Sequence, residues 1–278
     1  MIMEAAPHSQ IADHYARGSL VADIRDGLAA MGKTESTVTA EDLSPVDEFH
    51  IGGRAATGEL AGQLALNPRD RVLDIGCGLG GPARQIAAHY DCQVTGIDLT
   101  RDYVEAGNIL SGWLHLGERV SLQQGNALGM PFADGSFTAA YMLHVGMNIA
   151  DKSALFSEVA RVLRAGARFG VFDVMRTGVG ELSYPLPWAS TADTNAIAAP
   201  EQYRDTLSAA GFEILSERQR RDAALEYFAR QRAEVAMGRA VLGVQTLMGA
   251  RRPQMVRNMS ESISAGRIAP VEIIARRR

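Results

Sequence analysis

The segment from Arg71 to Gly81, with the sequence RVLDIGCGLGG, constrains the fold more than any other part of the chain. An apolar run leads into an acidic residue, and the turn that follows has four glycines in six positions. Glycine adopts positive φ without a steric penalty and lets a ligand lie against bare backbone. A helical pattern over residues 82–90 then begins at the same turn. A strand, a glycine turn and a helix N-terminus together are typical of a nucleotide-binding corner.

The glycines fit two spacings at once. Gly76, Gly78 and Gly81 match the dinucleotide pattern G-x-G-x-x-G. Gly76, Gly78 and Gly80, with Asp74 two residues ahead, match D-x-G-x-G-x-G. A glycine turn that binds no ligand is a third interpretation. Residues further along the chain must therefore decide between them.

The order of apolar and helical patterns predicts the fold class. Strand-like runs alternate with amphipathic helical segments from Val72 onward, which implies βαβ units. We therefore predict an α/β, Rossmann-like fold with a seven-stranded, mainly parallel sheet and helices on both faces. The expected strands are 72–75, 93–98, 120–124, 139–143, 168–173, 212–217 and 271–275, and the expected helices are 82–90, 101–116, 152–163, 201–210, 222–237 and 253–264.

The segments outside this alternation predict the domain organisation. Residues 1–63 are mostly helical in pattern and are expected to form an N-terminal lid over a core at 64–278. Two further segments, at about 176–200 and 222–266, are expected to form a cap. The two prolines between Tyr184 and Trp188 exclude a regular helix or a central strand there, because proline lacks the N–H donor.

Composition narrows the class of protein. The chain has 278 residues, a formal net charge of −4 and 46% hydrophobic residues, which suits a globular protein without a nucleic-acid surface. Two cysteines suggest reduced thiols in a cytoplasmic protein and give no four-ligand metal site. No run approaches the roughly 20 apolar residues of a membrane span, and no signal peptide is recognised. We expect no metal, no membrane partner, and a monomer or homodimer.

Further motifs carry a resemblance to a known family. Gly125-Asn126-Ala127, Met130-Pro131-Phe132 and Asp134-Gly135-Ser136-Phe137 resemble the string G-D-A…L-P-F…D-x-S-F-D, and Arg161 to Gly166 resembles R-V-L-R-P-G. With D-x-G-x-G-x-G, these motifs are similar to those of class I S-adenosylmethionine (SAM) methyltransferases. Glu48 to Gly53 resembles the H-x-G-G lid element of the small-molecule branch. That branch includes sarcosine and dimethylglycine N-methyltransferases, tocopherol methyltransferases and natural-product O-methyltransferases.

The resemblance implies SAM as cofactor and assigns residues to it. Asp74 would help to place the cationic methionine end, and Asp98 would bind the ribose hydroxyls. Asn126 stands where the family has an aspartate that reads the adenine amino group, and its carbonyl oxygen is still able to accept a hydrogen bond. The expected cofactor residues are Asp74, Gly76, Gly78, Gly80, Asp98, Leu99, Asn126, Ala127 and Leu143.

The acceptor should bind beyond the carboxyl ends of the strands. His144 and His50 are candidate proton acceptors or oxygen-binding groups, and Asn148 is a candidate hydrogen-bonding group. Structural histidines and packed aromatic side chains remain the alternative interpretations. The candidate substrate contacts are Tyr15, Glu48, Met147, Tyr184 and Trp188, with Tyr203 in the same cap stretch.

These observations predict methyl transfer from SAM to a nitrogen, oxygen or carbon of a small-molecule acceptor. A nicotinamide-dependent oxidoreductase on the same type of sheet is a second hypothesis. Lys33 and Lys152 are the only lysines, which removes a Tyr-x-x-x-Lys arrangement. A SAM-binding partner subunit without activity is a third. The acceptor atom stays open at this point.

Overall fold

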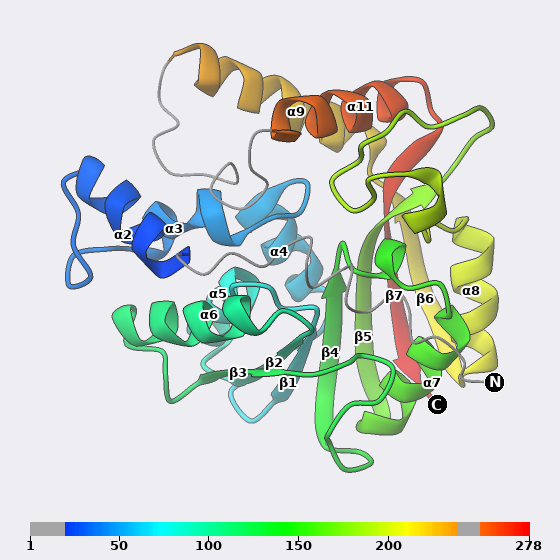
Figure 1. Ribbon diagram of the computed structural model, residues 1–278. Helices are drawn as coiled ribbons and strands as arrows, with labels where there is room; N and C mark the ends of the chain where they lie inside the picture. The colour runs from blue at the N-terminus through cyan, green and yellow to red at the C-terminus, as the bar shows by residue number, and fades with distance from the viewer. Residues whose placement is uncertain (1–19, 238–250) are drawn as a thin grey trace, which may run out of the picture.

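The computed structural model describes residues 20–237 and 251–278. Its central sheet has the strand order β3-β2-β1-β4-β5-β7-β6 (Figure 1). β1 to β5 run parallel to one another, and β7 runs antiparallel to both β5 and β6. The strands are β1 Arg71–Ile75, β2 Gln93–Asp98, β3 Val120–Gln124, β4 Phe137–Leu143, β5 Leu163–Arg176, β6 Phe212–Gln219 and β7 Ile268–Arg277.

The predicted fold class is confirmed, and each expected strand lies where the apolar pattern placed it. β5 is the main difference, because it begins at Leu163 rather than 168. Leu163 pairs with Phe137 ahead of an irregularity in the β4–β5 register, and this pairing extends the strand toward α7. The chain reverses its strand order between β1 and β4, and ligands of open α/β sheets bind at such a switch point.

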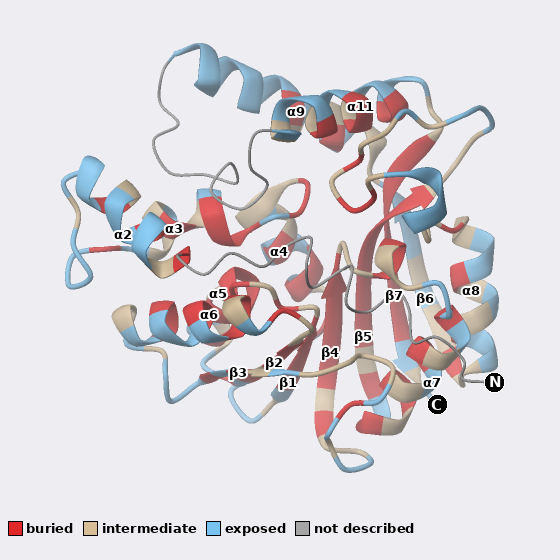
Figure 2. Cartoon of the chain, in the orientation of Figure 1, coloured by how far each residue is buried: buried red, intermediate tan, exposed pale blue. Residues whose placement is uncertain are grey.

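Helices cover both faces of the sheet, as the pattern predicted. One apolar cluster joins β4, β5 and β7 to Phe156 of α7 and Leu207 of α8. The other joins β1, β2 and β4 to Leu60 of α4 and Ile86 of α5. Figure 2 shows the resulting burial along β4, β5 and β7. These helices are α4 Gly53–Gly62, α5 Gly81–Tyr90, α6 Arg101–Trp113, α7 Lys152–Val162 and α8 Pro200–Ala209.

In the described part of the N-terminal segment, α2 Leu20–Ala30 and α3 Ala40–Asp47 come before α4. A capping box starts α3, because Thr39 accepts from the Asp42 N–H while the Asp42 carboxylate accepts from the Thr39 N–H. Apolar side chains of both helices pack on α6 and on Leu79 of the glycine turn. The region expected to form a lid therefore has an apolar base that is packed against the cofactor-side helices.

The cap helices α9 Arg221–Ala236 and α11 Arg252–Ser264 lie beyond the carboxyl ends of β4 and β5 (Figure 1). Phe228 of α9 and Ile263 of α11 pack with Trp188 and with Met147 of the loop after β4. Both α3 and the cap helices therefore lie at the carboxyl-end edge of the sheet, where the switch point is.

Candidate active site

The glycine turn has the backbone that its composition predicts. Gly76, Gly78 and Gly80 have φ values of 73°, 51° and 75°. A Cβ on Gly76 would lie 2.3 Å from a methyl carbon of Val145, so the turn and the loop after β4 approach each other too closely for any side chain. Gly80 is the N-cap of α5, and the first N–H groups of this helix point toward the turn.

Asp98 ends β2 and holds the glycine turn directly. Its Oδ2 accepts a hydrogen bond from the Gly78 N–H at 2.9 Å, and its Oδ1 accepts from the Thr100 N–H at 2.8 Å. Burial raises the pKa of Asp98, and these backbone donors oppose that rise. The neighbouring Leu99 carbonyl accepts from Gln124 at 3.1 Å. The acid predicted to bind ribose therefore lies beside the turn, at the correct edge of the sheet.

Asp74 is a buried carboxyl with an incomplete set of partners. Its Oδ2 has no hydrogen-bond partner among the described residues. Burial, with the nearby Asp98 and Glu48 carboxylates, raises its pKa to about 8. The Tyr141 hydroxyl faces the same carboxyl and lowers its pKa, although it makes no hydrogen bond of normal geometry. A buried carboxyl group with an unpartnered oxygen is suited to bind a cationic group of a ligand, because a nearby positive charge favours its ionised form.

Asn126 uses its side-chain oxygen within its own turn. Oδ1 accepts from the Leu128 N–H at 2.9 Å, and the Asn126 carbonyl accepts from the Gly129 N–H at 3.1 Å. Ala127 packs at the edge of the apolar core, and Leu143 ends β4 beside the switch point. The side-chain oxygen expected to accept a hydrogen bond from the adenine amino group therefore already accepts one from the backbone of its own turn.

The residues present fit a SAM molecule. A positive-φ glycine turn leaves bare backbone where a nucleoside would pass, Asp98 lies at the end of the next strand, and Asp74 presents an unpartnered carboxylate oxygen. The three predicted cofactor features therefore converge on one edge of the sheet.

A buried network lies across from this turn, on the segment between α3 and α4. His50 Nε2 lies 2.8 Å from Glu48 Oε2 and 3.0 Å from Thr57 Oγ1, and the Thr57 hydroxyl donates to Glu48 Oε2 at 2.8 Å. His50 Nδ1 also lies 3.3 Å from the Ile51 carbonyl oxygen. Both ring nitrogens of His50 are therefore engaged, whereas Glu48 Oε1 has no partner among the described residues.

His144 lies next to this network in an unusual backbone conformation. Its φ is 55°, a left-handed value that non-glycine residues rarely adopt, and its N–H donates to the Phe172 carbonyl at 2.7 Å. The rings of His144 and His50 have centroids 5.9 Å apart. Burial, together with His50, lowers the pKa of His144 well below its usual value. Its Nε2 is buried and makes no hydrogen bond within the described residues, so a neutral imidazole with an unpartnered nitrogen lies beside His50.

A second buried network fixes the loop after β4, which contains the short helix η1 Gly146–Asn148. The Tyr203 hydroxyl donates to Asp173 Oδ2 at 2.6 Å, and a Cβ on Gly146 would lie 2.4 Å from that oxygen. Lys152 Nζ donates to the Ile149 and Ala196 carbonyls. The loop that carries Met147 and Asn148 is thus tied to β5, to α8 and to the cap stretch.

Several predicted substrate contacts have other partners in the structure. Asn148 donates through Nδ2 to the Val145 carbonyl at 3.2 Å. Trp188 is buried, and its indole N–H donates to Asn195 Oδ1, while Asn195 donates to the Tyr184 hydroxyl. The expectation that Tyr203 borders the acceptor is wrong, because its ring is fully buried against α7 and its hydroxyl is bound to Asp173. Tyr15 lies outside the described residues.

The sequence did not single out Thr57, Tyr141, Lys152 or Asp173 as members of the site. Each is an ordinary residue on a helix or strand, and only the packing of distant elements brings it to a functional neighbour. Tyr141 is in register with Asp74 on the neighbouring strand β4, and the strand register was not part of the sequence prediction.

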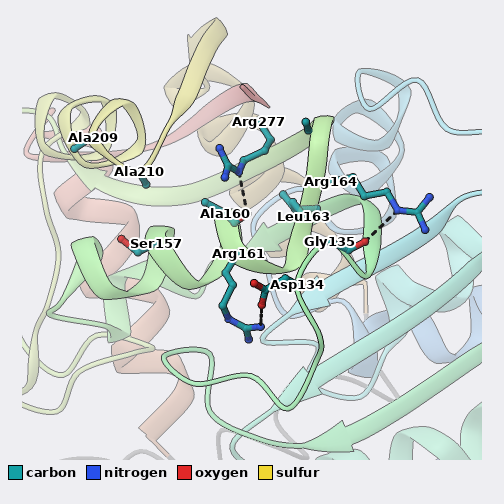
Figure 3. A pocket seen from close by; sticks show the side chains of 11 residues that line it. Asp134, Gly135, Ser157, Ala160, Arg161, Leu163, Arg164, Ala209, Ala210 and Arg277 are labelled. Atoms are coloured by element: carbon teal, nitrogen blue, oxygen red, sulfur yellow. Dashed lines mark hydrogen bonds and ion pairs between the residues drawn. The ribbon is translucent and has the colours of Figure 1, made fainter.

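Two other features of the molecule are separate from this site. Within residues 20–237 and 251–278, no cluster of three or more His, Cys, Asp or Glu side chains is placed to hold a metal ion, and no helix is long and apolar enough to cross a membrane. An open groove runs past Asp134, Arg161, Arg164 and Arg277 (Figure 3). This groove lies where β4 and β5 begin, at the opposite edge of the sheet from the glycine turn.

Comparisons with known proteins agree with this geometry. Residues 73–171 match the family model described as a methyltransferase domain. The chain is 29% identical over 202 residues to the O-methyltransferase resE of Aspergillus sclerotiorum, which covers 71% of this chain and 73% of that protein. It is 32% identical over 169 residues to a sterol 24-C-methyltransferase of Eremothecium gossypii, but this match covers 59% of the chain and only 45% of the relative.

Solved structures show the same fold over nearly the whole chain. A geranyl diphosphate C-methyltransferase from Streptomyces coelicolor, solved with Mg²⁺, geranyl-S-thiolodiphosphate and S-adenosyl-L-homocysteine, superposes with a TM-score of 0.72. The two sequences are 22% identical, and the match covers 99% of each chain.

Proposed function

This chain is a class I SAM-dependent methyltransferase, and from that premise we propose that it methylates a hydroxyl oxygen of a largely apolar small molecule. The observation that carries the proposal is the open Nε2 of buried His144 beside the Glu48–His50 pair. Bound SAM would supply an electrophilic methyl group on a sulfonium. When the bond from sulfur to this methyl group breaks, S-adenosylhomocysteine is the leaving group and its sulfur is neutral.

The residues of this chain must orient the hydroxyl and receive its proton. A neutral imidazole accepts a hydrogen bond from a hydroxyl group, and the lowered pKa of His144 keeps it neutral through the physiological range. As the oxygen forms its bond to the methyl carbon, the O–H bond breaks and the proton passes to His144 Nε2. General-base assistance of this kind contributes about 10²–10⁴ in rate.

Glu48 supports the same proton transfer from the segment between α3 and α4, and His50 holds Glu48 in place. Glu48 Oε2 is occupied by His50 and Thr57, so the open Oε1 is the carboxylate atom available to a ligand. Since both nitrogens of His50 already face oxygen atoms, we assign it to orienting Glu48 rather than to accepting the proton. The Glu48 carboxylate, two residues from His50, also favours the imidazolium formed at His144, because an opposite charge nearby stabilises the charged form.

The surroundings support an acceptor with an apolar body. Ile51, Met147 and Phe228 belong to one apolar cluster that connects the lid segment, the loop after β4 and the cap. The match to an O-methyltransferase that covers most of both chains supports oxygen as the acceptor atom. Because a sterol 24-C-methyltransferase is among the relatives, carbon is the competing acceptor atom.

The same proposal assigns roles to the lid segment, the core and the cap segments. We propose that residues 1–63 cover the bound cofactor, that residues 64–278 form the SAM-binding core, and that the cap segments near 176–200 and 222–266 bound the acceptor. The support is the position of α3, α9 and α11 around the switch point. A monomer or a homodimer would both serve this arrangement.

Methyl-labelled SAM tests the acceptor atom directly. The purified protein is incubated with matched acceptors that present a phenol, an aliphatic hydroxyl, an amine or an enolisable carbon on the same apolar body, and the labelled products are identified by mass spectrometry. We expect label on oxygen. Label on nitrogen or carbon alone would contradict the proposal.

The base is tested with His144→Gln and Glu48→Gln, with His89→Gln as the matched control because His89 is exposed at the end of α5. We expect kcat on the preferred acceptor to fall about 10²–10⁴-fold for His144→Gln, with S-adenosylhomocysteine affinity kept. Full activity in both site variants would refute a proton-accepting role.

A further inference from the structure

One buried ion pair joins the lid segment to the cofactor turn. Arg84 Nη2 donates to Asp47 Oδ2 at 2.6 Å, and the residues are only 2% and 5% exposed. Asp47 is the last residue of α3, one position before Glu48. Arg84 lies in the first turn of α5, four positions after Gly80. The pair therefore spans the two segments that must approach each other for methyl transfer.

The same guanidinium reaches a third helix. Arg84 Nη1 donates to the Gly107 carbonyl at 3.1 Å and to Ser111 Oγ at 3.2 Å, both in α6. A lysine has no planar fork and is unable to reproduce these directions together. Arg84 thus fixes α3, α5 and α6 relative to one another from a single point.

The contact between α3 and α5 is direct as well as electrostatic. A Cβ on Gly81 would lie 2.5 Å from the Asp47 carbonyl oxygen and 2.6 Å from Oδ1. Gly81 begins α5, so the end of α3 rests on the helix that the glycine turn opens. Any movement of Asp47 must therefore move Glu48 and His50 relative to Gly76–Gly80.

The energetics argue that stability alone does not explain this pair. Desolvation of two buried charges cancels much of their attraction, and apolar replacements of similar volume are often neutral or stabilising. Burial raises the pKa of Asp47 to about 6 even though Arg84 lowers it, which shows how large the desolvation cost is here. A costly pair at this position is better explained by the geometry that it imposes.

We propose that Asp47 and Arg84 are positioning residues that set the distance between the cofactor turn and the Glu48–His50 network. The inference rests on the proposed function, in which the Glu48–His50 network supports proton transfer from the acceptor. It adds that S-adenosylhomocysteine binding and the order of the lid segment are coupled through this pair. Reacting groups displaced by about 1 Å lose about 10²-fold in rate.

The test uses the double variant Asp47→Leu/Arg84→Met, which replaces the pair by apolar side chains, and the conservative variant Asp47→Asn. The control is Arg276→Met, which removes a guanidinium from the Glu213 carboxylate between β7 and β6, at the end of the sheet opposite the glycine turn. Each protein is compared for melting temperature, S-adenosylhomocysteine affinity by calorimetry, and ligand-dependent hydrogen exchange over residues 40–57.

We expect the double variant to melt near the wild-type temperature but to bind S-adenosylhomocysteine at least about tenfold more weakly, with kcat/KM lower by about 10²-fold. Ligand should no longer slow exchange over 40–57, whereas Arg276→Met should keep both the affinity and that protection. If the double variant does not fold, Asp47→Asn gives the same comparison with side-chain shape preserved. Wild-type affinity and protection in a folded pair variant would overturn the inference, while the absence of ligand binding by the wild type would instead overturn the proposed function.

Discussion

The Asp74 carboxyl and the Tyr141 hydroxyl face each other from neighbouring strands, β1 and β4, in direct register and in complete burial. Asp74 retains an unpartnered oxygen at this point, and no cation of the described residues contacts it. Asp74 therefore keeps its proton near neutral pH until a cationic ligand binds. For this reason we expect both the free energy of unfolding and the affinity for the ligand to depend on pH.

The first prediction concerns stability without ligand. The pKa of Asp74 is raised from 3.8 to about 8 on folding, so its contribution to the free energy of unfolding is full below about pH 4 and is lost as pH rises toward about 8. Asp74→Asn avoids this loss. We expect the variant to melt at a higher temperature than the wild type, with a difference that grows over this range and then levels. A difference that is constant or shrinks with pH would contradict the assigned ionisation.

The second prediction concerns the proton itself. A cationic methionine end beside Asp74 favours the carboxylate, so binding near pH 7 should release a proton to the buffer. Calorimetry of S-adenosylhomocysteine binding in two buffers of different ionisation enthalpy measures this release. We expect release in the wild type and much less in Asp74→Asn. Equal enthalpies in the two buffers for the wild type would show that Asp74 is already ionised.

The third prediction tests the glycine turn. Gly76→Ala places a Cβ 2.3 Å from Val145 at a φ of 73°, and the left-handed conformation alone costs roughly 1–2 kcal/mol. Gly112→Ala in α6 is the control, since no atom lies within 4 Å of its added Cβ. We expect Gly76→Ala to lose most S-adenosylhomocysteine binding and Gly112→Ala to keep it. Tight binding by a folded Gly76→Ala protein would mean that this turn is not the cofactor contact.

The fourth prediction concerns Asn126, which offers one oxygen where relatives of the resembled family have two. Because Oδ1 already accepts from the Leu128 N–H, an adenine amino group must share that atom. Asn126→Asp supplies a second acceptor for it. We expect S-adenosylhomocysteine to bind more tightly in the variant by about 0.5–1.5 kcal/mol, the usual net value of one hydrogen bond. Weaker binding would indicate that the amide nitrogen, as a donor, makes the contact.

The sequence predicted the sheet and the cofactor edge because both depend on local patterns. Apolar runs that alternate with helical segments predicted the positions of β1 to β7, and the glycine spacing with Asp98 predicted the position of the turn. The acceptor side was less predictable. His50 and His144 were identified from their strand-end and turn positions, but Thr57 and Arg84 join the site only through packing between α3, α4 and α5. Such contacts span 7 to 37 residues of sequence and leave no periodic signal.

The last prediction concerns the loop after β4, which the Asp173–Tyr203 pair holds in place. The Tyr203 hydroxyl donates to Asp173 Oδ2 at 2.6 Å. Burial raises the pKa of Asp173 to about 7 although this hydrogen bond opposes the rise. Tyr203→Phe removes the donor and leaves a buried carboxyl oxygen underpaired, at a cost of about 1–3 kcal/mol in stability. Asp173 also accepts from the Met147 N–H, so the loop that borders the acceptor should shift.

We therefore expect Tyr203→Phe to lower the melting temperature and to raise KM for the acceptor, with S-adenosylhomocysteine affinity unchanged. The folded pKa of Asp173 should rise further in the variant, so more of its stability should be lost as pH increases through 7 and above. Tyr90→Phe, at the partly exposed end of α5, is the matched control. Melting curves at several pH values, calorimetry and initial rates provide the three readouts. A Tyr203→Phe protein that loses stability but keeps the wild-type acceptor KM would show that the Asp173–Tyr203 pair supports the fold without positioning the loop.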